Sequence, residues 1–359
     1  MRKFAFLLVL LLFLSLVLPA FSTPLAKAAE DSWTTLAPLP VTSYSMGATV
    51  LNGTIYIVGV AKNGNTYNYQ YNPSTNTWLA KTPMPTNRVS FAVAACQNKI
   101  YVISGSPSAT FAAPTEVYDP KTDTWEQKDW ISTPRISMEA NVVDGKIYVI
   151  GGGVPLNLFR VIPASNVNEV YDPETDSWSY LERMPTAVKN YASAVVDGKI
   201  YIIGGSNPWD FPNVALNLVQ IFDPKINQWS QGTPIPIGVS GATAGATTGE
   251  LAPKRIYVLG GSPVDPESEP CNLTQVYDPE KNVWSTGAPM PTPDRDFGVA
   301  VVNDELYVIT GNNEKYTPIG YIPEFPSWAL MLITLVAGVA GMVIYRRSLH
   351  KQKQRREIA

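Results

Sequence analysis

The stretch YASAVVDGKIYIIGGSNPWDFPNVALNLVQIFDPKINQW, from Tyr191 to Trp229, contains the signals that decide the fold. Small and apolar residues at its start predict one strand, and Asp197-Gly198 is a pair that closes a two-residue hairpin. The apolar run from Ile200 predicts a second strand, which ends at two glycines. The Phe-Asp-Pro turn ends a third strand, because Asp bonds its own backbone and Pro fixes φ. The fourth strand carries the Trp, so this stretch predicts four short antiparallel strands.

The same unit recurs at intervals of about fifty residues, which is the signature of a repeat architecture. The copies of the second strand are IYIVGV from Ile55, IYVISG from Ile100, IYVIGG from Ile147, IYIIGG from Ile200, IYVLGG from Ile256 and LYVITG from Leu306. The aromatic turn segments end at Trp78, Trp125, Trp178, Trp229 and Trp284. Four-stranded units repeated around an axis make the blades of a β-propeller, in which each sheet packs against its neighbours.

Trp33 decides how the ring closes. The segment SWTTLAPLP reads as a last strand without its first three, whereas the sixth unit has three strands and no Trp. We therefore expect the N-terminal strand to complete the sixth blade, beside a third strand that ends near Tyr321, where YIPE stands in for YDPE. This closure removes two free sheet edges that would invite aggregation. The sequence predicts an all-β, six-bladed propeller over residues 31–324, with an irregular first strand in the fifth blade.

The glycine-terminated strands, the Tyr-Asp-Pro turns and the following Trp residues together resemble the Kelch family of repeats. The resemblance extends from about Trp33 to Tyr321, and six concordant copies make it specific. The fold alone does not specify a function, and we expect a binding module rather than an enzyme because long loops gather on one face of the predicted propeller. Because some propellers similar to this one act on sugars, the alternative is a sugar-active enzyme of the sialic-acid mutarotase type, which needs neither metal nor histidine.

Both ends of the chain carry targeting signals. Residues 1–28 combine two basic residues with an apolar run, which is typical of a secretory signal peptide, although a retained anchor is the alternative. Residues 325–345 include the uncharged stretch WALMLITLVAGVAGMVIY and predict one transmembrane helix. The basic tail at 346–359 then places the C-terminus in the cytoplasm. We expect a single-pass protein of the cell membrane, with the propeller outside.

The segment IPEFPSW, just before the apolar stretch, resembles the PEF-type C-terminal sorting signals of archaeal surface proteins. That resemblance implies a second possibility, in which the apolar segment is removed and the domain is attached to another anchor. Both routes leave the propeller at the cell surface, where its partner is an extracellular protein or a glycan.

Composition excludes several other classes of function. The net charge is −3 without a basic stripe in the repeat region, which argues against nucleic acid as a partner. The sole histidine, His350, lies in the tail, so no imidazole is present for a metal site or a nucleophile's base. The D-P-x-T-D turns lack the glycine and terminal Glu of an EF-hand and are interpreted as capped turns. We expect no metal and no other cofactor.

The two cysteines, Cys96 and Cys271, are expected on opposite faces three blades apart, so a disulfide is not expected. Sequons begin at Asn52 and at Asn272, in an expected turn and loop, and are candidate glycosylation sites that also arise by chance.

The connections between second and third strands are long in blades two to five, and long loops on a rigid scaffold usually carry binding. Two of these loops are apolar and offer Phe159 and Arg160 in blade three and Trp209 and Phe211 in blade four. We predict that they contact a partner. The alternative is that they fold over the blade tops and pack on each other.

Four basic residues stand at the starts of the inner strands on the same face. They are Arg88, Arg135, Lys189 and Arg295. We expect them to ring the mouth of the channel, where they would bind an anionic or polar ligand such as an acidic sugar. The alternative is a structural role, in which they donate hydrogen bonds to loop carbonyls.

Overall fold

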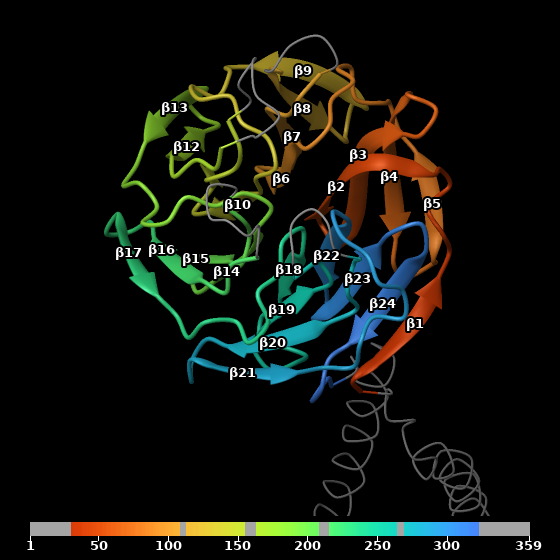
Figure 1. The fold of residues 1–359 in the computed structure, drawn as a ribbon. Coiled ribbons are helices and arrows are strands. Elements are labelled where there is room, and N and C mark those ends of the chain that lie inside the picture. Colours follow the sequence, from red (N-terminus) through yellow and green to blue (C-terminus); the bar gives the residue numbers. More distant parts are fainter. Residues whose placement is uncertain (1–29, 108–112, 155–162, 208–214, 264–268, 323–359) are drawn as a thin grey trace, which may run out of the picture. The chain divides into compact units, whose positions relative to one another are not determined.

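The protein is described here by a computed structural model over residues 30–107, 113–154, 163–207, 215–263 and 269–322. These residues form 24 strands in six four-stranded antiparallel sheets, which stand around a central axis (Figure 1). The prediction of an all-β, six-bladed propeller is confirmed. Within these ranges no helix is long and apolar enough to cross a membrane. The expected signal peptide, transmembrane segment and tail fall outside the described residues.

Each blade has strands a, b, c and d, counted outward from the axis. In blades 1 to 3 they are β2 (Ser43–Leu51), β3 (Thr54–Ala61), β4 (Thr66–Asn72) and β5 (Thr77–Ala80); β6 (Ala92–Cys96), β7 (Lys99–Ile103), β8 (Thr115–Asp119) and β9 (Thr124–Lys128); and β10 (Ala140–Val143), β11 (Lys146–Ile150), β12 (Asn168–Asp172) and β13 (Ser177–Tyr180). In blades 4 to 6 they are β14 (Ala192–Val196), β15 (Lys199–Ile203), β16 (Val219–Asp223) and β17 (Gln228–Gln231); β18 (Thr243–Ala246), β19 (Ile256–Leu259), β20 (Thr274–Asp278) and β21 (Val283–Thr286); and β22 (Gly298–Val302), β23 (Glu305–Ile309), β24 (Asn313–Thr317) and β1 (Ser32–Leu36).

The sixth blade is closed by the N-terminal strand, as predicted. Trp33 on β1 stands opposite Tyr316 on β24 in an antiparallel pair. The expected end of the third strand was wrong, because β24 stops at Thr317 and Tyr316, not Tyr321, takes the place of the turn tyrosine. The reason is a short b-to-c connection in this blade, where Thr310 N–H already bonds to Asn312 O at 2.8 Å. The third strand therefore starts and ends earlier than in the other blades.

The core consists of the repeated apolar b strands, which are buried on both faces because neighbouring blades cover them. Ile147 in blade 3 and Ile200 in blade 4 are both 0% exposed and share one cluster with Phe222. The glycines that end the b strands allow the backbones to approach closely. A Cβ on Gly152, whose φ is +88°, would lie 2.8 Å from Ile136 O, which explains the paired glycines.

A hydrogen-bonded clamp joins each blade to the one before it. Between blades 1 and 2, Trp125 Nε1 donates to Thr82 O at 2.9 Å, and Thr82 N–H donates to Asp123 Oδ1 at 3.0 Å. Tyr118 also donates its phenolic proton to Asp123. The D-P-x-T-D turns are thus capped turns: Asp119 accepts Lys121 N–H within the turn, and Asp123 reaches the neighbouring blade. The residues in the place of Asp123 are Asn76, Asp176, Asn227, Asn282 and, for blade 6, Asp31.

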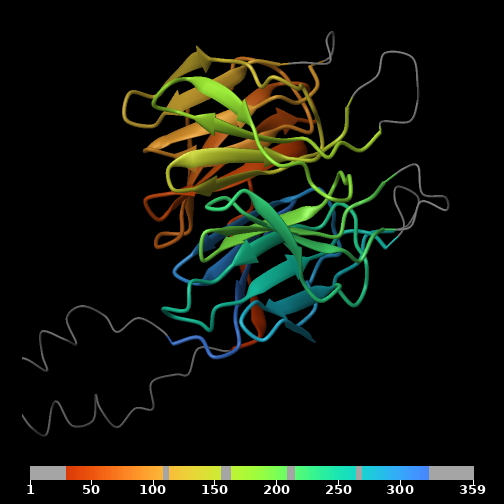
Figure 2. The ribbon, with the colours of Figure 1, turned by 90° about the vertical axis from the view of Figure 1, so that its left-hand side faces the viewer.

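The two faces of the propeller differ in their connections (Figure 2). The a-to-b turns on one face are two residues long except in blade 5, and Asp197 and Gly198 show the positive φ values of a hairpin turn. The opposite face, here called the loop face, carries the b-to-c and d-to-a connections, which are bridged by pairs such as Lys189 and Ser206. Because Ser32 pairs with Thr317, β1 starts and β24 ends on the a-to-b face, away from the loop face.

The irregular first hairpin of blade 5 is organised by a carboxylate from blade 6. Asp304, only 2% exposed, accepts backbone N–H groups from Thr248 at 2.6 Å, Leu251 at 2.8 Å and Ala252 at 3.0 Å. Burial favours the neutral acid, but these donors outweigh it and lower the pKa of Asp304. The long connection between β18 and β19 is therefore held by the adjacent blade instead of by a tight turn.

Candidate ligand site in the central channel

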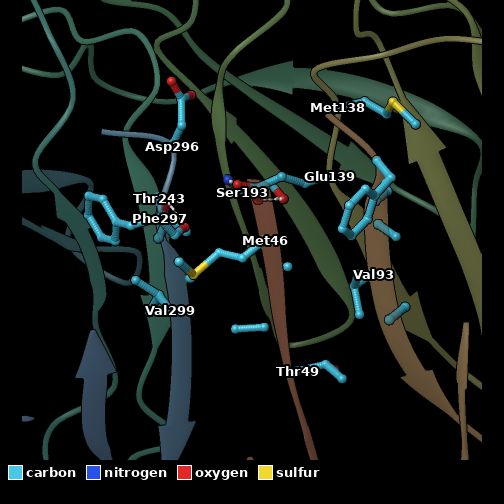
Figure 3. Close-up of a pocket in the computed structure, with 18 of the residues that line it drawn as sticks. Met46, Thr49, Val93, Met138, Glu139, Ser193, Thr243, Asp296, Phe297 and Val299 are labelled. Atoms are coloured by element: carbon cyan, nitrogen blue, oxygen red, sulfur yellow. Dashed lines mark hydrogen bonds between the residues drawn. The ribbon is translucent and has the colours of Figure 1, made fainter. Parts of the chain in front are cut away.

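The six a strands enclose a cavity of about 870 Å³ on the propeller axis (Figure 3). Its wall is built in rings, because equivalent positions of the a strands lie at equal depth. The ring nearest the loop face is here called the rim ring and consists of Ser45, Ser90, Ser137, Asn190, Gly241 and Asp296. The next position in each strand is mostly apolar and is occupied by Met46, Phe91, Met138, Tyr191, Ala242 and Phe297.

Backbone hydrogen bonds link the rim ring from blade to blade. Ser137 N–H donates to Ser90 O at 3.0 Å, and each following blade repeats the link as far as Asp296, whose N–H donates to Gly241 O at 2.9 Å. Between blades 1 and 2, Ser90 N–H donates to the Ser45 hydroxyl at 3.2 Å, so that five hydrogen bonds join the six members in order from Ser45 to Asp296. Five members have φ between +52° and +70°, a strained conformation for all but glycine. The mouth is thus a rigid polar ring.

Glu139 occupies the third position along this wall, where the other blades have small residues. By strand register its equivalents are Gly47, Ala92, Ala192, Thr243 and Gly298. The space there is narrow, since a Cβ on Gly47 would come within 2.4 Å of Val93 Cγ2. One carboxylate in a ring of small residues breaks the sixfold repeat. An alignment of the blades within the sequence would have revealed it, but we did not predict it.

The Glu139 carboxylate points toward blade 4 (Figure 3). Its Oε2 accepts Ser193 N–H at 3.0 Å and the Ser193 hydroxyl at 2.6 Å. The Glu139 backbone N–H donates to the Tyr191 hydroxyl at 3.2 Å, and Tyr191 in turn donates to Ile150 O. The side chain is therefore fixed at its base and at one oxygen, in a half-buried place on the channel wall.

Asn141 extends this network away from Glu139. The Ser193 hydroxyl has one proton, which goes to Glu139, and Asn141 Oδ1 lies 3.0 Å from the same Ser193 oxygen. Asn141 Nδ2 is buried and has no partner within the described residues. A rotation of the Asn141 side-chain amide by 180° exchanges Oδ1 and Nδ2, so that Nδ2 donates to the Ser193 oxygen. Asn141 Nδ2 and the Ser193 hydroxyl oxygen then both have a partner. In this series of hydrogen bonds Asn141 donates to Ser193, and the Ser193 hydroxyl donates its proton to the Glu139 carboxylate.

Burial raises the pKa of Glu139 to about 7, although the two hydrogen bonds from Ser193 oppose the shift. The carboxyl group therefore exists in both protonation states near neutral pH. A group of this kind can donate or accept a proton with equal ease.

Two of the four predicted basic residues lie inside the blades instead of at the mouth. Arg88 is 0% exposed, pairs with Glu116 at 2.6 Å and donates Nη1 to Ser104 O. Arg135 is also 0% exposed, pairs with Glu169 at 2.6 Å and donates Nη1 to Gly151 O and Val167 O. Both guanidinium groups hold the b-to-c connection, so the geometry supports their structural role over ligand contact.

The other two basic residues differ from each other. Arg295 lines the cavity beside Asp296, whereas Lys189 is half-buried and is not among the lining residues. The matching strand starts therefore do not form a basic ring. The four loop residues Phe159, Arg160, Trp209 and Phe211 lie outside the described residues.

The remaining sequence features are placed as follows. Cys96 and Cys271 are both free thiols, as expected, the first buried and the second half-buried. Asn52 is exposed in an a-to-b turn, and Asn272 is half-buried before β20. Among the described residues, no group of three or more His, Cys, Asp or Glu side chains could hold a metal ion.

Fold and cavity define a propeller with a polar, ligand-sized channel. The model of the Kelch motif matches residues 87–128, 134–185, 187–236 and 253–291, just over half of the chain. The chain therefore belongs to the Kelch-motif family. The four matches cover parts of blades 2 to 5.

Two similar curated proteins are Kelch-like protein 35 of Mus musculus, 32% identical over 41% of this chain, and beta-scruin of Limulus polyphemus, 28% identical over 41%. The matches span 23% and 16% of those proteins, so this chain corresponds to a minor part of their length. Among solved structures, that of YjhT matches with a TM-score of 0.67 at 18% identity, over 77% of this chain and 92% of that one. This likeness shows the shared fold.

Proposed function

We propose that the propeller is a binding module, displayed outside the cell, that takes a polyhydroxylated ligand such as a glycan into the mouth of its channel. The observation that carries the proposal is the rim ring, in which backbone bonds fix hydroxyl, amide and carboxylate side chains around one opening. Pre-organised polar groups around a concave site favour ligands rich in hydroxyl groups, because no ordering is needed on binding.

The charge of the wall favours a neutral ligand over an acidic sugar. The described lining carries the carboxyl groups of Glu139 and Asp296 and one guanidinium, that of Arg295. Arg88 and Arg135 cannot add positive charge at the surface, because each is buried and paired with a glutamate. We therefore revise the expected ligand from an anionic to a neutral polyol.

The apolar loops of blades 3 and 4 remain the second part of this proposal. The described ends of these loops lie on the loop face, the same face as the rim ring, and in the sequence Phe159 and Trp209 stand between those ends. Chain geometry supports access, since β1 starts and β24 ends on the opposite face.

A glycan array and calorimetry on the full-length protein test the proposal. We expect neutral glycans to bind, and Glu139→Ala to abolish that binding by removing the one carboxylate that faces the channel below the rim. The matched control is Glu126→Ala, an acid on the outer strand β9 that is paired with Lys99 at the surface. Binding that survives Glu139→Ala and is lost in Trp209→Ala or Phe159→Ala would move the site to the loops. Absence of any glycan binding would refute the ligand class.

Glu139 also favours a second candidate, a sugar isomerase that needs no histidine. Interconversion of sugar anomers requires two proton transfers. The anomeric hydroxyl loses its proton, and the ring oxygen is protonated as the ring C–O bond breaks. The open form then closes on the other face. A carboxyl group with a pKa of about 7 can perform both transfers in turn.

Magnetisation-exchange NMR on a sugar that the array identifies tests this second candidate. If the protein accelerates anomer exchange, Glu139→Gln should reduce the rate by about 10²–10⁴-fold, because Gln cannot transfer a proton. The same variant should still bind the sugar, since the amide keeps an acceptor oxygen. Binding without acceleration in the unmodified protein would leave the binding role and remove the enzymatic one.

A further inference from the structure

Two positions that recur in the blades are occupied by residues whose charges differ from blade to blade. The first position precedes each a strand, and its carbonyl accepts an N–H from a glycine of the preceding blade; it holds Arg135, Val188, Val239 and Asp294 in blades 3 to 6. The second lies on the c strand, opposite Val149, Ile202, Val258 and Val308 of the b strands in blades 3 to 6; it holds Glu169, Gln220, Gln275 and Glu314. Blade 2 has Arg88 and Glu116 at these positions.

In blades 2 to 5 the two residues of the pair carry no net charge together. In blades 2 and 3 a buried guanidinium pairs with a buried carboxylate at 2.6 Å. In blades 4 and 5 the pair is uncharged, and the Gln amide bonds instead to the backbone of Thr186 or Ile237. Blade 6 alone of these five places two acids together, Asp294 and Glu314.

The contacts of Glu314 match those of Glu116 at one oxygen and differ at the other. Glu116 Oε1 accepts the Thr86 hydroxyl, and its Oε2 meets Arg88. Glu314 Oε1 likewise accepts the Thr292 hydroxyl, at 3.1 Å. Glu314 Oε2 is buried without a partner in the described part of the chain, in a residue that is only 3% exposed. This is the oxygen that faces a cation in blade 2, and in blade 6 the neighbouring residue is Asp294.

Backbone oxygens surround the same place. The carbonyls that accept Arg88 Nη1 in blade 2, those of Ser104 and Pro114, correspond in blade 6 to those of Thr310 and Asn312. The Thr310 hydroxyl donates to Asn312 O at 3.0 Å and satisfies that carbonyl. The Thr310 carbonyl, Glu314 Oε2 and the Asp294 carboxylate remain as oxygen ligands; Asp294 Oδ1 also accepts Arg295 N–H at 2.8 Å, and the positive charge of Arg295 interacts with this carboxylate.

We propose that blade 6 binds a calcium ion between Asp294 and Glu314, in the place that a guanidinium group occupies in blades 2 and 3. Two carboxylates balance a divalent charge, and carboxylate and carbonyl oxygens are the ligands that calcium prefers. An unpaired buried carboxylate is costly, so the ion supplies the compensation that Arg supplies elsewhere. With few protein ligands, water completes the shell and the affinity is in the millimolar range of extracellular calcium modules.

Thermal unfolding of the full-length protein with calcium or a chelator tests the site. At a calcium concentration about 10 to 100 times Kd, we expect Tm to rise by about 3–6 °C over the chelator sample. Magnesium should have a much smaller effect, since it demands a tight octahedral shell. Equal responses to calcium, magnesium and potassium would overturn the assignment, as would the absence of any calcium response.

The sister blades supply the matched variants. Asp294→Arg recreates the pair of blades 2 and 3, and Glu314→Gln recreates the amide of blades 4 and 5, so both should fold. Each is expected to abolish the calcium response, whereas Asp197→Asn, on an exposed a-to-b turn, should keep it. A response that persists in both variants would overturn the proposal. If Tm ignores calcium and rises on acidification, and Glu314→Gln removes that rise, the two carboxyl groups share a proton, which also overturns it.

Discussion

Tyr316 donates its phenolic proton to Asp31 at 2.6 Å, across 285 residues of sequence. Asp31 Oδ1 also accepts Ala288 N–H, and Trp33 Nε1 donates to Ala288 O at 3.0 Å. These are the same three bonds that Tyr118, Asp123 and Trp125 make inside one stretch of chain. The N-terminal strand therefore brings the complete clamp of a blade with it, and ring closure repeats an ordinary blade junction.

Asp31→Ala should lower the free energy of unfolding by about 2–4 kcal/mol, because the buried Tyr316 and the half-buried Ala288 N–H lose their acceptor. Asp31→Asn should cost much less, since Asn76, Asn227 and Asn282 accept the equivalent backbone N–H in blades 1, 4 and 5. Urea unfolding of the two variants measures the difference. Equal stabilities for Ala and Asn would show that the closure clamp contributes nothing.

Arg135→Val should cost about 3–5 kcal/mol, because it leaves the buried Glu169 carboxylate without its cation and with the Thr133 N–H as a remaining donor. Adding Glu169→Gln recreates the Val188 and Gln220 pair of blade 4 and should recover most of the loss. The comparison of the single and double variants by urea unfolding isolates the unpaired charge from the lost side-chain volume. A double variant as unstable as the single one would contradict this account.

Glu139 should make the protein less stable as pH rises. Its folded pKa of about 7 lies above the usual value of 4.5, so between these values the folded state holds a proton that the unfolded state has lost. Stability is then present below pH 4.5 and is lost as pH rises through 7. Because the group faces the channel and is only half-buried, we expect a loss of about 1–2 kcal/mol instead of the full value of the shift.

The pH dependence of urea unfolding between pH 5 and pH 8 measures this effect. Glu139→Gln should flatten the profile, whereas the surface variant Glu126→Gln should leave it unchanged. A profile that rises with pH in the unmodified protein, or one that Glu139→Gln does not alter, would exclude Glu139 as the titrating group.

Both thiols should react slowly in the native protein. Burial raises the pKa of Cys96 and of Cys271, which lowers the fraction of reactive thiolate at neutral pH. After denaturation without reductant, iodoacetamide should add two groups, which mass spectrometry can count. Addition of no groups would show a disulfide that the structure does not contain.

The fold could be predicted from the sequence because its four-stranded unit is repeated. Glycine-containing b strands and Trp-bearing d strands recur six times and two-residue a-to-b turns five times, and local chemistry sets each of them, so Trp33 was enough to assign the closure. The end of β24 was misplaced because Tyr321-Ile-Pro resembles the repeat more than Tyr316-Thr-Pro does. What distinguishes the two is the partner Asp31, which only pairing across the ring brings close.

The candidate site was harder to predict than the fold. Arg88 and Arg135 stood out because they are charged and periodic, yet periodicity is what a structural role in each blade produces. Glu139 departs from the repeat, and its environment depends on Ser193 and Tyr191 of the next blade.

By itself, the sequence determined the number of blades, the order of strands and the strand that closes the ring, because turns and apolar periodicity act between near neighbours in the chain. Only the tertiary structure decided which charges are neutralised inside the blades, which carboxylate faces the channel, and that Asp294 and Glu314 lie close enough to interact electrostatically while Glu314 Oε2 has no hydrogen-bond partner among the described residues. Those properties depend on burial and on contacts between blades, which a pattern of residues along one strand does not contain.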